Sequence, residues 1–125
     1  MLFYFDENLP HQLAEALNCL DKDNEIKSVK NDYQGIKDNN LIENLAKNNA
    51  ILITKDKRMK KYNAERELLI QYKLRVLFYE STVNDYWGIV VLFIKNWGKI
   101  TKTFEKKNEG PYFITMGTNG KITEI

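Results

Sequence analysis

Short, continuous apolar runs alternate along the chain with stretches whose apolar residues recur every three or four positions. Continuous runs are typical of strands buried on both faces, and the three-to-four spacing marks one face of a helix. Strands that alternate with helices predict a mostly parallel sheet covered by helices on both faces. The predicted strands cover residues 2–5, 26–29, 50–54 and 75–79.

Four helices are predicted between and after these strands. The first follows Pro10, which suits a first helical turn, with Asn8 as a candidate cap. A loop over residues 31–40 leads to the second helix, for which Asp38 and Asn39 are candidate caps, because short polar side chains accept hydrogen bonds from free helix N–H groups. The third and fourth helices are expected over residues 64–73 and 85–106.

The C-terminal residues predict a hairpin. Residues 112–116 and 121–125 would pair around Asn119-Gly120, a dipeptide that suits a tight turn. The pattern leaves open whether this hairpin extends the sheet or lies apart from it.

Composition narrows the class of protein. The 125 residues suit one domain over residues 1–125, and a hydrophobic share of 43% is enough for a core. Cys19 is the lone cysteine, which excludes an internal disulfide and a multi-cysteine metal site and fits a reducing compartment. The longest apolar run, residues 86–94, is shorter than the roughly 20 residues of a membrane span. With no secretory signal at the N-terminus, we expect a cytoplasmic protein without membrane contact.

Acidic residues follow two of the predicted strands. Asp6 and Glu7 come directly after the first strand, and Asp56 comes shortly after the third. Ligands bind outside the carboxyl ends of the strands in open α/β sheets, so these carboxylates would meet at one edge if the two strands are neighbours. Asp38 could complete the cluster. Like charges held close together need a proton or a cation between them, and oxygen ligands alone favour Mg²⁺ or Mn²⁺ over zinc.

Each of these acids also has a purely structural interpretation. An aspartate after a strand is often a helix cap, and for Asp38 the cap interpretation leads. For Asp6 and Asp56 together the site interpretation leads, because both follow buried strands. Glu7 is as well explained as a surface neighbour as it is as a metal ligand. Lone His11 is expected on an exposed first helical turn, and nucleophilic catalysis has little support.

Net charge is only +2, which does not by itself indicate a nucleic-acid partner. Local clustering is more informative, because five cations lie within seven residues around Asp56. Such a run is usually a solvated surface, but carboxylates bordered by cations are what metal-assisted phosphodiester hydrolysis requires. Tyr62 could stack on a base, and Trp87 and Trp97 are interpreted as core or partner contacts. The cations are Lys55, Lys57, Arg58, Lys60 and Lys61.

Several motifs resemble a known family. Residues 5–10 (Phe-Asp-Glu-Asn-Leu-Pro) resemble the "LDENLP" opening of small prokaryotic PIN-like proteins, and residues 53–58 (Ile-Thr-Lys-Asp-Lys-Arg) resemble their "VTKD" or "VTRDRR" segment. Residues 63–66 (Asn-Ala-Glu-Arg) resemble the "xAER" of the VapC-type toxin branch. The strand from Arg75, the long helix and the C-terminal segment also recur there, so the resemblance covers nearly the whole chain.

The resemblance implies a PIN-like three-layer α/β/α sandwich with a C-terminal long helix and hairpin. It also implies an Mg²⁺- or Mn²⁺-dependent endoribonuclease acting on RNA, commonly a toxin neutralised by an antitoxin protein, and it suggests a homodimer. Asp6, Asp38 and Asp56 would be the catalytic acids that hold the metal and orient a water for attack on phosphorus. Lys55, Lys57 and Arg58, within the basic run, would hold the RNA backbone.

The chain departs from the family pattern at two places. PIN nucleases carry a further acid shortly after the third-strand aspartate, whereas Arg58 stands there and the next acid is Glu65. Many members also have Glu where this chain has Asp38. One metal, with Glu7 or Glu65 assisting, is therefore as consistent with the sequence as two.

Two other functions remain open at this stage. A PIN-like module that binds RNA or a protein without cutting would fit the missing acid. A receiver-type signalling domain would also carry acids after the first strand and an aspartate after the third. Receivers usually have a lysine at the end of a later strand, where this chain has Tyr79-Glu80, so that hypothesis ranks last.

Overall fold

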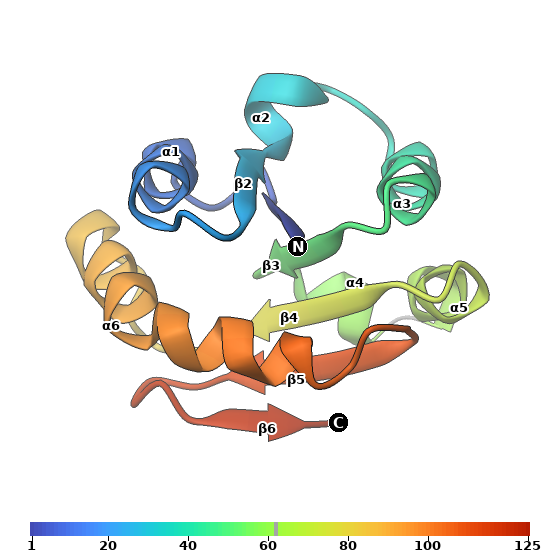
Figure 1. Ribbon diagram of the computed structural model, residues 1–125. Helices are drawn as coiled ribbons and strands as arrows, with labels where there is room; N and C mark the ends of the chain where they lie inside the picture. Colours follow the sequence, from blue (N-terminus) through green and yellow to red (C-terminus); the bar gives the residue numbers. More distant parts are fainter. Residues whose placement is uncertain (62) are drawn as a thin grey trace.

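A computed structural model describes residues 1–61 and 63–125, with the side chains of Lys57 and Arg58 outside the description. A six-stranded sheet runs through the centre of this described chain (Figure 1). The strand order is β2-β1-β3-β4-β5-β6, with parallel neighbours as far as β5 and an antiparallel β6 at the edge. The strands are β1 (Leu2–Phe5), β2 (Glu25–Ser28), β3 (Ile51–Thr54), β4 (Arg75–Tyr79), β5 (Tyr112–Met116) and β6 (Ile122–Glu124).

The predicted strands, including the final one, are confirmed to within one residue at each end. The second strand ends at Ser28 and not at Val29, because Val29 opens a short helix whose cap is the Ser28 hydroxyl. That hydroxyl accepts a hydrogen bond from the Lys30 N–H at 3.2 Å. The open question of the C-terminal hairpin is settled as well, since β5 pairs with β4 and the hairpin extends the sheet.

The helices differ from prediction in two places. The predicted loop over residues 31–40 is wrong at both ends, because it includes the end of α2 and the start of α3. A further short helix, α4, occupies the basic run that follows β3. The helices are α1 (His11–Leu20), α2 (Val29–Asp32), α3 (Asp38–Lys47), α4 (Lys57–Lys61), α5 (Asn63–Gln71) and α6 (Tyr86–Glu105).

Helices cover both faces of the sheet (Figure 1). Helices α1 and α6 pack on one face, in a core that includes Phe3, Phe5 and Phe93. Helices α2 to α5 pack on the other face, in a second core that includes Tyr4 and Leu52. Side chains alternate between the faces along each strand, so the continuous apolar runs supply both cores. The predicted three-layer α/β/α sandwich with a long C-terminal helix is confirmed.

Aromatic contacts pack α6 against strands β1 and β4. The Phe93 ring lies 5.1 Å from the Phe5 ring of β1 and 5.4 Å from the Tyr79 ring of β4. Trp97 meets Phe3 edge-on at 4.9 Å. Such pairs add about 0.5–1.5 kcal/mol each beyond the area that they bury. They bind the ends of β1 and β4 to one rigid helix, and these are the ends at which the candidate site lies.

The outward face of α6 is apolar in its first half. Trp97 is buried, as the core interpretation predicts, but Trp87 is 71% exposed and Val91 is 59% exposed. Ile94 continues the same face one turn further on. Within the described ranges, no helix combines the length and the apolar character that crossing a bilayer requires.

Replacing Phe93 with alanine should destabilise the fold by about 3–5 kcal/mol, because a fully buried ring is lost and a cavity remains. The exposed Val91→Ala on the same helix is the matched control, with an expected change within about 0.5 kcal/mol. Urea unfolding followed by circular dichroism measures both free energies. Equal effects of the two substitutions would contradict the packing described for α6.

Candidate active site

The strand order reverses direction beside β1, because β2 lies on one side of it and β3 on the other. Such a switch point leaves a crevice at the carboxyl ends of the strands, where open α/β proteins bind their ligands. The first and third strands are neighbours, which meets the condition set by the sequence, and Phe5 is in register with Ile53. Asp6 and Asp56, which follow these two strands, therefore lie at the same edge of the sheet.

Asp6 is held in a defined position. Its side chain and backbone are only 7% exposed. Its Oδ2 accepts a hydrogen bond from the Thr54 hydroxyl at 2.7 Å, and its Oδ1 accepts one from the Glu7 N–H at 2.8 Å. Its own N–H donates to the Ile53 carbonyl at 2.8 Å. These bonds fix the carboxylate and leave each oxygen with further accepting capacity.

Thr54 connects the two acids at this edge. The residue is fully buried at the end of β3. Its hydroxyl donates to Asp6 and accepts a hydrogen bond from the Asp56 N–H at 3.0 Å. Sequence analysis missed this role, although the threonine stands within the motif of residues 53–58. The signal was a hydroxyl in an otherwise apolar buried strand, where a polar group needs a partner.

Burial raises the pKa of the Asp6 carboxyl above its ordinary value. The hydrogen bonds from Thr54 and from the Glu7 N–H act in the opposite direction, and the charges of Asp38 and Asp56 raise the pKa further. The charged form of Asp6 is therefore destabilised where it stands. A bound cation or a proton would relieve that cost.

Asp38 is placed near this edge by the start of α3. The cap residue of α3 is Lys37, so the interpretation of Asp38 as the cap is wrong. Asp38 lies in the first helical turn instead, close enough to Asp6 for its charge to act on the Asp6 pKa. Among the described residues, however, no three His, Cys, Asp or Glu side chains lie close enough together to hold a metal ion. The three acids therefore lie close enough for their charges to interact, but not close enough to bind one metal ion together as they stand.

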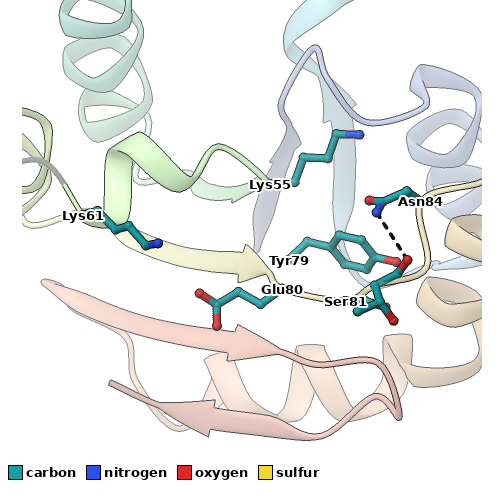
Figure 2. A pocket seen from close by; sticks show the side chains of 7 residues that line it. Lys55, Lys61, Tyr79, Glu80, Ser81 and Asn84 are labelled. Atoms are coloured by element: carbon teal, nitrogen blue, oxygen red, sulfur yellow. Dashed lines mark hydrogen bonds between the residues drawn. The ribbon is translucent and has the colours of Figure 1, made fainter.

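A hollow of about 480 Å³ lies at the end of β4, and Lys55, the residue before Asp56, contributes to its lining. Figure 2 shows Lys61 on the α4 side and Asn84 across from it, with Tyr79 and Glu80 between them. Tyr79 is anchored there, since its hydroxyl donates to the Val83 carbonyl. The hollow is lined by Lys55, Lys61, Tyr79, Glu80, Ser81, Thr82 and Asn84.

The basic run contributes unequally to this region. Lys55 and Lys61 line the hollow, whereas the Lys60 ammonium forms an ion pair with Glu80. The side chains of Lys57 and Arg58 lie outside the described residues, as does all of Tyr62, so their predicted contacts with RNA stay predictions.

The remaining candidates lie at the surface. The Glu7 side chain is exposed, and only its N–H contacts Asp6. His11 stands in the first turn of α1, as expected, but it is half-buried, with its Nδ1 3.7 Å from a Glu15 carboxylate oxygen. Neither side chain takes part in the hydrogen bonds that join Asp6, Thr54 and Asp56.

Comparison with known proteins gives one match. A family model described as a PIN-like domain matches residues 1–81. No curated protein and no solved structure matches the chain. The matched segment contains the three acids and the whole basic run, and it ends just after β4. The match confirms the PIN-like resemblance and leaves the VapC-type branch a prediction.

The raised Asp6 pKa predicts a specific pH dependence of stability. A carboxyl whose pKa is higher in the folded than in the unfolded state favours folding fully below the unfolded value, and this contribution is lost as pH rises through the folded pKa. Asp6→Asn removes that loss, so in EDTA the variant should become more stable than the native protein as pH rises from about 4 to 8. Urea unfolding at a series of pH values measures the difference. A constant difference across this range would mean that Asp6 ionises without cost.

Proposed function

Because the chain belongs to the PIN-like domain family, we propose that it is a metal-dependent endoribonuclease that hydrolyses RNA phosphodiester bonds. The observation that carries the proposal is Asp6, a buried carboxylate at the strand-order switch point, with Asp56 and Asp38 close enough to raise its pKa. Structural aspartates at strand ends are normally exposed or cap helices. A buried acid held beside two further acids is instead typical of catalytic and metal sites.

The donor set fits an oxygen-preferring divalent cation. Asp6, Asp38 and Asp56 would hold Mg²⁺ or Mn²⁺, with the exposed Glu7 as a further candidate ligand. When bound, such an ion neutralises developing charge on phosphate oxygens and acidifies a bound water. The raised pKa of Asp6 supports this assignment, since a cation stabilises the charged form that burial disfavours.

The protein's own groups would then position the reaction. The bonds from Thr54 and the Glu7 N–H keep the Asp6 oxygens in place, so little reorganisation is needed when substrate binds. The carboxylates would orient the attacking water in line with the leaving oxygen. Lys55, which lies directly before Asp56, would hold a non-bridging phosphate oxygen, and Lys57, Arg58, Lys60 and Lys61 would attract the RNA backbone.

A finer part of the proposal is that the protein is the cytoplasmic toxin of a toxin–antitoxin pair. Its protein partners would be an antitoxin and a second copy of the chain, in a homodimer. Both need an apolar contact surface, and Trp87, Val91 and Ile94 on the outward face of α6 offer one.

Two observations favour a non-catalytic RNA-binding module as a second candidate. The described residues contain no group of three acids within metal-binding reach of one another, and Arg58 stands where relatives are expected to carry a further acid. The receiver-type hypothesis has less support. Receivers share the order 2-1-3-4-5 of the parallel strands, so the topology does not separate them, but the family match and Glu80 at the end of β4 favour a PIN-like domain.

The nuclease proposal predicts cutting of mixed single-stranded RNA in Mn²⁺, blocked by EDTA. Asp56→Asn, purified identically, should cut more than about 100-fold more slowly, because loss of a direct ligand costs more than the ~10–100-fold typical of residues behind the ligands. Gel analysis of product release with time measures both rates. Equal cutting by the two preparations would identify a contaminant. No cutting by either, with RNA still bound in EDTA, would favour the binding module.

Metal binding predicts a change in stability that does not depend on activity. Mn²⁺ at about 100 times its dissociation constant should stabilise the native fold by about 2.7 kcal/mol. Asp6→Asn should lose most of this gain, because the buried member of the acid cluster is neutralised. Thermal melting with and without Mn²⁺ measures it, with Ca²⁺ as a comparison ion. An equal rise in melting temperature for the native protein and for Asp6→Asn would mean that Mn²⁺ binds at another site.

A further inference from the structure

A second hollow, of about 400 Å³, lies on the other side of Lys55 from the first. Its apolar lining comes from Leu9, Pro10 and Ile89, and Tyr86 contributes an aromatic ring. Amide side chains, two lysines, a glutamate and a histidine complete it. These polar residues are Asn8, Gln12, Asn84, Lys30, Lys55, Glu7 and His11.

Tyr86 is presented to solvent in a defined orientation. It is the first residue of α6, next to the cap Asp85, and it is 42% exposed. Its ring stands edge-on against the Trp87 ring, with the centroids 5.3 Å apart at an interplanar angle of 87°. The exposed part of the ring offers an aromatic surface on which a base can stack.

The two hollows adjoin, because Lys55 and Asn84 line both of them. Lys55 also directly precedes Asp56, so the lining that they share lies one residue from a candidate catalytic acid. The first hollow is rich in hydroxyls, from Tyr79, Ser81 and Thr82, whereas the second combines an apolar floor with amides.

We propose that the second hollow is a base-binding subsite for single-stranded RNA, with Tyr86 as its stacking platform and Lys30 and Lys55 on the flanking phosphates. The strand would cross Lys55 and place its next sugar and phosphate in the first hollow. The inference rests on the proposed function, because it names the part of the substrate that this site takes.

The chemistry of the hollow selects this ligand. A volume of about 400 Å³ is in the range of small-ligand pockets and suits one nucleotide. Stacking on an aromatic ring tolerates any base, while the amides can pair with base edges. A paired base presents no free face, so a duplex would first have to extrude the nucleotide.

The test is RNA binding in EDTA, where no metal-dependent cutting occurs. Fluorescence anisotropy of a labelled 12-nucleotide single-stranded RNA is measured for the native protein and for Tyr86→Ala, with Leu20→Ala, at an exposed position at the end of α1, as the control. Tyr86→Ala should bind about 5- to 100-fold more weakly, as expected for one lost base stack. Tyr86→Phe, which keeps the ring, should restore most of the affinity. The same sequence as a duplex should bind more weakly than the single strand.

Two further readouts separate stacking from a structural effect. A 2-aminopurine base in the RNA should be quenched by the native protein and not by Tyr86→Ala. Lys30→Ala should reduce the steepness of the salt dependence by about one phosphate contact. Unchanged affinity and quenching in Tyr86→Ala, or preference for the duplex, would overturn the subsite.

The outcomes also separate this inference from the nuclease proposal. Binding that depends on Tyr86, without cutting in Mn²⁺, would support the subsite and overturn catalysis. Cutting in Mn²⁺ with Tyr86→Ala binding like the native protein would support catalysis and overturn the subsite. Absence of RNA binding and of cutting would overturn both.

Discussion

The burial of the Asp6 carboxylate between β1 and β3 is the constraint on which the rest of the site depends. A buried carboxylate is costly unless hydrogen bonds or a cation stabilise it. Thr54 and the Glu7 N–H supply the hydrogen bonds, and the Thr54 bond is available only because the two strands are neighbours in register. The aromatic contacts of Phe93 then tie β1 and β4 to α6. The packing of one face of the sheet therefore holds the acids in place.

The strands were predictable from the sequence because each is a short apolar run with clear ends. The positions of Asp6 and Asp56 at one edge of the sheet were predictable as well, once β1 and β3 are parallel neighbours. Sequence analysis missed what depends on partners distant in sequence. Thr54 gains its role from Asp6, which is 48 residues away, and the Lys60–Glu80 ion pair joins two segments 20 residues apart. No local pattern records either contact. Helices α2 and α4 were missed because four or five residues carry too little periodicity.

Acids and lysines are interleaved at this edge of the sheet. Asp6 is buried, Asp38 is exposed, and Lys55, next to Asp56, lines both hollows. Glu80 pairs with Lys60, which reduces the positive charge beside the first hollow and leaves Lys55 and Lys61 as its lining cations. Lys55 is positioned to offset the repulsion between Asp56 and a polyanion. The overall charge of +2 conceals this arrangement because the opposite charges cancel in the sum.

The two proposed parts of the site come from different parts of the chain. Asp6, Asp38 and Asp56 lie within the segment that the PIN-like model matches, whereas Asn84 and Tyr86 lie beyond residue 81. The later segment also supplies α6, whose inner face packs on the sheet and whose first turn carries Tyr86 at the surface. Changes at Tyr86 or Asn84 alter a hollow without removing a buried contact of Asp6. The fold thus allows substrate preference to vary on the start of α6 while the acids stay fixed by the sheet.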